Sequence, residues 1–230
     1  MGVVNKLYLK AIAKRILAIL KINDPDRFLK KAKGVIHIGA NIGQERDLYY
    51  NNNLPVLWVE PIPEIFKILQ DNLVGFSKQI AFQELITDID DGTFSFNIAN
   101  NNGASSSILD FNLHKNIWPD VSYEKKISLQ SITLSSFLKR EAINITDYDT
   151  LIMDTQGSEL RVLKGAASIL HNFKFIKTEV PDFESYKGCC QLKDINEFLS
   201  LYGFRELSRN KFIESTAVGN YYDIVYERKK

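Results

Sequence analysis

Short apolar runs that end in a turn alternate with helix-like segments along most of this chain. The clearest unit starts at residues 35–38, a short and mainly apolar run that leads into a glycine-bearing turn at residues 39–43 and then into a polar segment ending near Tyr50. Two further runs, at residues 56–60 and 149–154, each end on an acid. Strands that alternate with helices form parallel sheets, because a parallel neighbour is reached through a crossover helix. The pattern therefore predicts a Rossmann-like α/β fold, with a mostly parallel sheet covered by helices on both faces.

The remaining elements continue this alternation. Helices are expected after residue 60 to about residue 72 and at residues 133–140, 158–170 and 192–202, and strands at residues 80–85, 93–98, 126–131 and 173–180. A last pair of strands, near residues 204–207 and at residues 221–226, indicates a hairpin that gives the sheet an antiparallel C-terminal edge. No repeat, low-complexity tract or interdomain linker interrupts residues 33–230, so we expect one domain over this range.

Residues 1–32 are expected to form a helical extension, packed on or beside this domain. Over residues 3–20, apolar side chains recur at helical spacing while lysines mark another face, which predicts a basic amphipathic helix. We favour a helix that covers the domain, with peripheral contact to a membrane or a partner protein as the alternative. A second, short helix is expected at residues 25–31, with Pro25 in its first turn.

The charge balance and the cysteines exclude several classes of protein. The chain has 230 residues, with 29 Lys and Arg against 28 Asp and Glu, so no net field would gather nucleic acid. The only cysteines, Cys189 and Cys190, are adjacent, which disfavours a disulfide-stapled secreted fold. Neither a signal peptide nor a spanning helix is evident, so we expect a cytoplasmic location, and Asn144-Ile145-Thr146 is interpreted as a chance glycosylation sequon.

The glycine-bearing turn gains meaning from an acid that follows it. A turn after a strand and before a helix is where a doubly wound sheet binds nucleotide-like ligands, although such glycines are also common for conformational reasons alone. Glu60 ends the next strand, about 20 residues further on, where an acid can accept hydrogen bonds from ribose hydroxyls. Sites for NAD and for S-adenosylmethionine share this geometry. Because the turn lacks the three-glycine fingerprint of pyrophosphate sites, a ligand without phosphates is favoured.

Several motifs, taken in order, resemble those of the FkbM-type methyltransferase family. The similarity spans roughly residues 33–226, and the Asp-x-Gln-Gly-x-Glu stretch at residues 154–159 is its most distinctive part. The other matching motifs are VIHIGANIG at residues 35–43, VEP at 59–61, TD at 87–88, SSS at 105–107, VLKG at 162–165 and KTEV at 177–180. This resemblance implies a class I methyltransferase fold that uses S-adenosylmethionine, usually acts on oxygen, and is often tied to sugars, surface glycans or secondary metabolites.

The resemblance also implies roles for individual residues. The methionine end of the cofactor would be lined by Gly39, Ala40, Asn41 and Gly43. Glu60 would hold the ribose, and Thr87 and Asp88 would lie near the adenine. Members commonly carry an acid where this chain has His37, and that acid helps to hold the charged amino-acid end of the cofactor. For His37, a cofactor contact and a purely structural strand-end histidine are both open, because a cofactor role needs a suitably oriented imidazole.

Three carboxylates are candidates for the chemical step. Methyl transfer to an alcohol requires alignment of the acceptor and removal of its proton, and Asp154, at the end of a buried strand, is the expected base. Glu159 and Glu179 approach the same rim, although an acid at Glu159 is also favoured by the dipole of the helix that starts there. The same three side chains are a donor set that Mg²⁺ or Ca²⁺ accepts, so a divalent metal is an open alternative.

A polar loop at residues 100–107 offers amides and hydroxyls suited to a sugar, and His114 and Trp118 follow it with a polar group and a stacking face. We therefore expect an S-adenosylmethionine-dependent O-methyltransferase that acts on a sugar, a glycan or a glycosylated small molecule. The alternatives are a nicotinamide-dependent oxidoreductase and a non-catalytic cofactor-binding or scaffold protein. The sequence does not determine the oligomeric state.

Overall fold

The computed structural model describes residues 25–229, and the chain divides into two compact units, Met1–Lys31 and Ala32–Lys230. The described part of the first unit holds a short 3-10 helix, η1 (Arg27–Lys31), where a helix is expected. The amphipathic helix expected at residues 3–20 lies outside the described residues. No helix within residues 25–229 combines the length and the apolar character needed to cross a bilayer.

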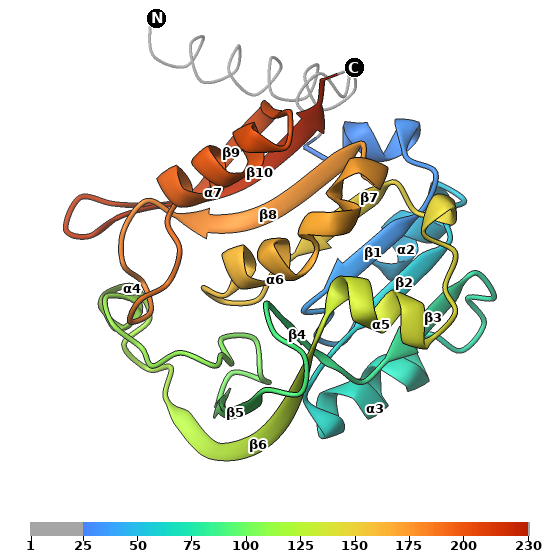
Figure 1. The fold of residues 1–230 in the computed structure, drawn as a ribbon. Helices are drawn as coiled ribbons and strands as arrows, with labels where there is room; N and C mark the ends of the chain where they lie inside the picture. Colours follow the sequence, from blue (N-terminus) through green and yellow to red (C-terminus); the bar gives the residue numbers. More distant parts are fainter. Residues whose placement is uncertain (1–24, 230) are drawn as a thin grey trace, which may run out of the picture. The chain divides into compact units, whose positions relative to one another are not determined.

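A seven-stranded sheet organises the second unit, in the order β3-β2-β1-β7-β8-β10-β9. Its strands are β1 (Val35–Ile38), β2 (Val56–Val59), β3 (Gln79–Phe82), β7 (Thr150–Met153), β8 (Phe175–Pro181), β9 (Phe204–Ser215) and β10 (Gly219–Arg228). The first five are parallel, and the β9–β10 hairpin adds an antiparallel edge (Figure 1). The predicted Rossmann-like α/β architecture, with its antiparallel C-terminal edge, is confirmed.

Helices cover both faces of this sheet because successive strand residues point to opposite sides. Ile36 and Leu151 face a large apolar core to which Phe137, Leu163 and Leu199 contribute. These three residues come from α5 (Leu134–Arg140), α6 (Glu159–Gly165) and α7 (Leu192–Leu201), which share one face (Figure 1). His37 and Trp58 point to the other face, where Tyr49 of α2 (Arg46–Asn51) packs against both rings. The remaining helical segments are α3 (Pro63–Asn72), α4 (His114–Ile117), η2 (Ile145–Asp147) and η3 (Ala167–Asn172).

A second sheet has the order β4-β6-β5, and the polar loop at residues 100–107 follows its strand β5. Its strands are β4 (Leu85–Thr87), β5 (Thr93–Ala99) and β6 (Tyr123–Thr133). The single strand expected at residues 80–85 is therefore wrong: β3 belongs to the large sheet, whereas β4 pairs in parallel with β6. Both pieces contain apolar residues, so the pattern does not mark where the chain changes sheets. Likewise, the helix expected at residues 158–170 is divided into α6 and η3, next to the close approach of Gly165 to the Thr87 carbonyl.

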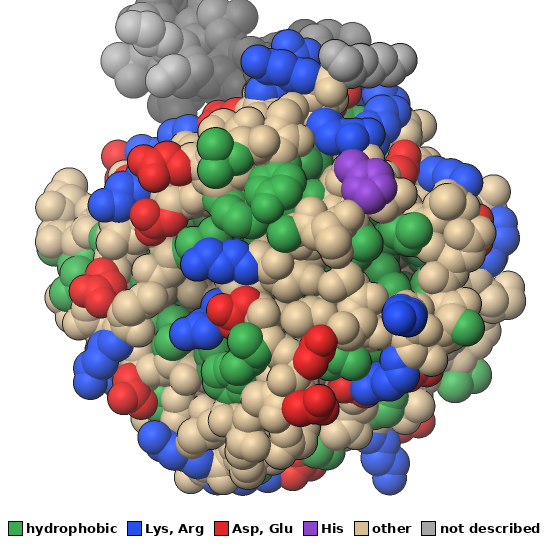
Figure 2. Space-filling view, viewed as in Figure 1, with side chains coloured by type: hydrophobic (Ala, Val, Ile, Leu, Met, Phe, Trp, Pro, Cys, Tyr) green, Lys and Arg blue, Asp and Glu red, His purple; other side chains and the backbone are tan. Residues whose placement is uncertain are grey.

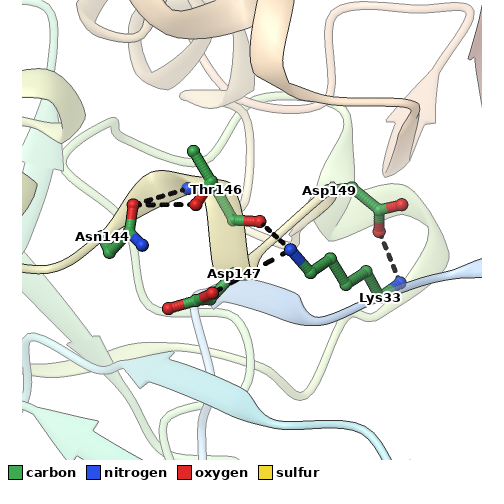
Figure 3. Close-up of polar contacts among 5 residues, drawn as sticks. All are labelled: Lys33, Asn144, Thr146, Asp147 and Asp149. Atoms are coloured by element: carbon green, nitrogen blue, oxygen red, sulfur yellow. Dashed lines mark hydrogen bonds and ion pairs between the residues drawn. The ribbon is translucent and has the colours of Figure 1, made fainter.

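A small polar network links the segments that precede β1 and β7 (Figure 3). The Lys33 backbone N–H donates to Asp149 Oδ1 at 2.7 Å, and its Nζ donates to the Thr146 carbonyl at 2.5 Å. Asn144 Oδ1 accepts from the Thr146 backbone N–H at 3.2 Å and from the Thr146 hydroxyl at 2.9 Å. The Asn-Ile-Thr run is thus a local helix cap before β7. On the face drawn in Figure 2, basic and acidic side chains are interspersed, in keeping with the balanced composition.

Candidate functional site

A cavity opens at the carboxyl ends of β1, β2 and β7, with about 790 Å³ of empty space that is partly open to solvent. Its walls come from the turns after these three strands, from the start of β4 and from the loop after β5. The lining residues are His37, Ile38, Gly39, Ala40, Asn41, Gln44, Glu45, Glu60, Pro61, Ile62, Glu84, Leu85, Ile86, Phe96, Gly103, Ala104, Ser106, Asp154, Thr155, Gln156 and Ser158. This is the ligand position expected for an open α/β sheet.

Close packing of the turn after β1 explains its glycine. Gly39 has φ +79°, in the left-handed region, and a Cβ built on it would lie 1.9 Å from the Asp154 carbonyl oxygen. The glycine therefore lets the turn touch the end of β7 and brings Ala40 and Asn41 to the cavity beside Asp154. Gly43 also has a positive φ, of +73°, but it faces Leu69 of α3 and does not line the cavity.

The Gly39→Ala variant is expected to lose about 3 kcal/mol or more of unfolding free energy, because a backbone overlap adds to the strained φ. The Gly75→Ala variant is the matched control. Gly75 also has a positive φ, of +93°, but a Cβ built on it would meet no atom within 4 Å, so only the conformational cost of about 1 kcal/mol remains. Urea denaturation of both variants measures the difference, and equal losses would show that the turn does not pack on β7 as described.

Glu60 lines the cavity from the end of β2. Its Oε2 accepts from the Asn41 backbone N–H and its Oε1 from the Ile62 backbone N–H, each at 2.9 Å. Burial raises the pKa of Glu60 to about 7, although these two N–H groups oppose the shift. The carboxylate thus couples the glycine turn to the second strand while it lines the cavity.

His37 lies at the floor of the cavity between two aromatic rings. Its ring stacks on Trp58 with centroids 4.8 Å apart, and Nδ1 shares a hydrogen bond of 3.1 Å with the Tyr49 hydroxyl. Burial, followed by the charge of Lys177, lowers the pKa of His37 to about 3. The imidazole is therefore neutral at physiological pH and offers the cavity a polar but uncharged side chain.

Asp154 lies at the junction of the main cavity with a smaller one of about 220 Å³. Burial raises the pKa of Asp154 to about 7; the Gln156 amide opposes this shift, and the charges of Glu159, Glu45 and Asp223 add to it. A carboxyl that titrates near neutral pH is matched to proton transfer at that pH.

Glu179 and Glu159 occupy different environments. Glu179, on β8, lines the smaller cavity with Asp154, and burial raises its pKa well above the ordinary value. Glu159 is buried, and its Oε1 accepts from the backbone N–H groups of Thr155 at 2.9 Å and Gly157 at 3.1 Å. These contacts favour the helix-start interpretation of Glu159. Across residues 25–229, no three His, Cys, Asp or Glu side chains are arranged to hold a metal ion.

Thr87 and Asp88 do not line either cavity. The Thr87 hydroxyl donates to the Ile89 carbonyl at 3.2 Å, and Asp88 forms an ion pair with Arg161 at 3.0 Å. The main cavity is bounded on this side by Glu84, Leu85 and Ile86 instead.

An aromatic cluster lies over the smaller cavity, and most of it has no signal in the sequence. His114 is buried, with Phe111 and Trp118 each at a centroid distance of 4.6 Å and Tyr186 at 5.1 Å. Tyr186 and Tyr221 line the cavity itself. Both tyrosines come from segments remote from the loop at residues 100–107, so no spacing rule connects them to it.

His114 is expected to make stability depend on pH. Its Nε2 contacts Ser105 Oγ at 3.2 Å, while Nδ1 is buried and has no hydrogen-bond partner among residues 25–229. Burial, followed by the charge of Lys115, lowers the pKa of His114 to about 4. As the pH falls, His114 takes up a proton in the unfolded chain before it does so in the folded protein. The stability contributed by the neutral, buried His114 is therefore fully present above pH 6.5 and is lost as the pH falls toward 4.

We expect the wild type to lose about 2 kcal/mol more unfolding free energy than the His114→Gln variant between pH 7 and pH 5. Urea denaturation of both proteins at both pH values measures this, and the comparison cancels the carboxyl groups that titrate in the same range. An equal loss in the two proteins would show that His114 is not buried in its neutral form.

Comparisons with known proteins match this geometry. Residues 37–206 match the model of the methyltransferase FkbM domain. The chain is 25% identical, over 196 residues, to the 2-O-methyltransferase NoeI of Sinorhizobium fredii (strain NBRC 101917 / NGR234), covering 82% of this chain and 76% of that protein.

Two solved structures are similar at lower levels. Magnesium protoporphyrin IX methyltransferase of Synechocystis PCC 6803, with bound cofactor, is 12% identical over 100% of this chain and 85% of its own, with a TM-score of 0.48. TrmK of M. capricolum, in complex with S-adenosyl-homocysteine, is 9% identical over 86% of this chain, with a TM-score of 0.46, and the match spans only 62% of its own length. With TM-scores below 0.5, these two similarities add nothing to the assignment.

The family match spans most of the chain and contains the glycine turn, Glu60, Asp154 and the aromatic residue Tyr186. It confirms the resemblance drawn from the ordered motifs. A methyltransferase is therefore the interpretation of this chain, in place of a nicotinamide-dependent oxidoreductase. This chain belongs to the FkbM methyltransferase family and is an S-adenosylmethionine-dependent methyltransferase.

Proposed function

We propose that the enzyme methylates a hydroxyl group of a sugar, a glycan or a glycosylated small molecule, with Asp154 as the base. The observation that carries this proposal is the position of Asp154, a residue that lines both the main cavity and the smaller cavity beside it. A group at this junction can contact an acceptor in one cavity while a cofactor fills the other.

The main cavity fits a nucleoside-type cofactor. A Cβ on Gly39 would overlap the backbone of β7, so the turn is closed against the strand ends and presents its small residues to the cavity. The cofactor's methionine end would lie against Ala40, Asn41 and His37, and its ribose against Glu60. When bound, it supplies a methyl group activated by a sulfonium. Asp88 and Thr87 lie outside the lining, so Leu85 and Ile86 are the side chains proposed to border the adenine.

The role of Asp154 follows from its environment. At pH 8 its carboxyl is mostly ionised and can accept the proton of an alcohol as the alcohol oxygen attacks. Glu179 lies in the same small cavity, and burial raises its pKa well above the ordinary value, which favours its protonated form. A protonated Glu179 can donate a hydrogen bond to a neighbouring acceptor oxygen.

The chemistry of the walls supports a neutral polyhydroxyl acceptor. Within the described residues, neither cavity is lined by Lys or Arg, whereas acidic side chains line both. A phosphate or carboxylate close to the reacting hydroxyl would therefore be repelled. Tyr186 and Tyr221 line the smaller cavity with aromatic rings, which suit the apolar faces of sugars. The relative NoeI is named a 2-O-methyltransferase, which agrees with transfer to oxygen.

Incubation with labelled S-adenosylmethionine and a panel of neutral, aminated and phosphorylated saccharides tests the acceptor class. We expect label to enter neutral saccharides and to be lost with the Asp154→Asn variant. Label in phosphorylated saccharides alone, or in amines or proteins instead of sugars, would overturn the proposal.

A further inference from the structure

We propose that Tyr186 is a positioning residue, which fixes the Gln156 amide with its NH2 group toward Asp154 and thereby leaves one carboxylate oxygen of Asp154 for the acceptor. This inference rests on the proposed role of Asp154 as the base. It concerns a tyrosine that is remote from the sequence motif containing Asp154 and Gln156.

Three side chains form a short chain of hydrogen bonds. The Tyr186 hydroxyl donates to Gln156 Oε1 at 2.6 Å, and Gln156 Nε2 donates to Asp154 Oδ1 at 2.6 Å. An amide has one acceptor end and one donor end, so a donor held at Oε1 dictates that the NH2 group faces the carboxylate. The reversed amide would place an oxygen against Asp154 and would leave the buried tyrosine hydroxyl without this acceptor.

The backbone of Gln156 has an uncommon conformation and is hydrogen-bonded to the polar loop. Its φ is +52°, a left-handed conformation that is uncommon for residues other than glycine. The Ser107 hydroxyl donates to the Gln156 carbonyl at 2.8 Å, which ties the turn after β7 to the polar loop. A glycine would adopt this φ more easily, so the presence of a glutamine points to a use for its side chain.

Tyr186 is itself fixed on several sides. Its side chain is buried, and its ring packs against Phe111 and His114 at centroid distances of 5.5 and 5.1 Å. Burial raises the pKa of Tyr186 well above 10, so the hydroxyl keeps its proton and acts as a donor at all physiological pH values. Its second contact, to the Ser105 carbonyl, is longer at 3.4 Å, which leaves Gln156 as the main acceptor.

The surroundings make the orientation of this amide important. Acidic groups face Asp154 from elements on several sides, and no Lys or Arg lines either cavity in the described part of the chain. These groups are Glu45 before α2, Glu60 after β2, Glu159 at the start of α6, Glu179 on β8 and Asp223 on β10. The Gln156 amide is the group that opposes burial and these charges at Asp154, and it also acts in the same sense on Glu179.

The arrangement serves the proton transfer in two ways. Gln156 occupies Oδ1 of Asp154, so the other oxygen is the one presented to an acceptor hydroxyl. The donated hydrogen bond also favours the ionised carboxyl, which is the form that accepts a proton. Tyr186 acts on Asp154 only through the amide and needs no contact with the acceptor.

The titration of Asp154 tests the proposal without knowledge of the acceptor. In protein labelled with ¹³C at the aspartate carboxyl, saturated with S-adenosylhomocysteine, the Asp154 resonance is assigned by its absence from the Asp154→Asn variant. We expect a pKa near 7 in the wild type and a pKa about one pH unit higher in Tyr186→Phe, since the amide is then free to turn. The acid limb of the kcat/KM profile should move in the same direction once an acceptor is in hand.

Two further variants keep the test decisive. Tyr226→Phe is the matched control, because it also removes one buried hydroxyl. The Tyr226 hydroxyl donates to Asn196 Oδ1 at 2.6 Å, and neither residue lines a cavity. This variant should therefore leave the Asp154 pKa unchanged. Gln156→Asn tolerates the left-handed backbone but is too short to bridge Tyr186 and Asp154, so it should reproduce the higher pKa even if Tyr186→Phe does not fold.

The outcomes separate this inference from the proposed function. An Asp154 pKa that is the same in the wild type, Tyr186→Phe and Gln156→Asn overturns the positioning role, whatever the activity of Asp154→Asn. Full turnover by Asp154→Asn overturns the proposed base, whatever the titration shows. A higher pKa in both positioning variants, combined with loss of turnover in Asp154→Asn, supports both.

Discussion

Replacement of Asp154 by Asn is expected to lower kcat by about 1,000-fold, the range typical for removal of a positioned general base. Asparagine keeps the size of the side chain and still accepts the hydrogen bond from Gln156, but it cannot take a proton from the acceptor. Because burial disfavours the charged form of Asp154, replacing this carboxylate by a neutral amide should not lower the thermal stability of the protein at pH 8. Loss of turnover with equal or greater thermal stability is the signature of an acid retained for chemistry.

The control for this variant lies at the other end of the same strand. Asp149 precedes β7, and its Oδ1 accepts from the Lys33 backbone N–H at 2.7 Å, far from the cavity lining. Asp149→Asn should lose some stability and keep its turnover. Steady-state assays and thermal melts of both variants measure the contrast. If Asp154→Asn retained turnover and Asp149→Asn lost it, the base would have to be sought elsewhere.

Replacement of Glu60 by Ala is expected to weaken binding of S-adenosylmethionine by about 100-fold, the loss of one or two charge-assisted hydrogen bonds to a ribose. The variant also leaves the backbone N–H groups of Asn41 and Ile62 without their carboxylate acceptor, which loosens the glycine turn. Since burial raises the pKa of Glu60 to about 7, the ionised form predominates only above that value. Wild-type affinity should therefore fall as the pH drops from 8 to 6.

Titration calorimetry at pH 8 and pH 6 measures both effects. Glu60→Gln keeps the shape of the side chain and removes its charge, so its affinity should be low and independent of pH over this range. A Glu60→Gln variant that binds as tightly as the wild type at pH 8 would show that the carboxylate does not contact the cofactor.

The sequence predicts those parts of the site that are carried by strand ends. Gly39, Glu60 and Asp154 each follow a short apolar run, and the carboxyl ends of neighbouring parallel strands meet at one edge of a sheet. The mostly parallel sheet and its antiparallel C-terminal hairpin follow from the same alternation.

Other features depend on contacts between segments that are distant in the chain. Tyr186 reaches Gln156 through a loop after β8, and no local pattern indicates that it turns toward the site. The long edge strand β9 is rich in charged, exposed residues, so it lacks the apolar alternation that identifies a strand. Glu159 shares a motif with Asp154, but its carboxylate turns to backbone N–H groups, a choice that side-chain identity does not reveal.

Calorimetric titration of the wild-type protein with S-adenosylmethionine at pH 8 tests the central claim most directly. Saturable binding at one site, with a Kd between about 1 μM and 1 mM, is expected for a cofactor held in the cavity between the glycine turn and Glu60. NADH should give no heat of binding, because the turn lacks a pyrophosphate fingerprint. Binding of NADH with no response to S-adenosylmethionine would contradict the account of this site.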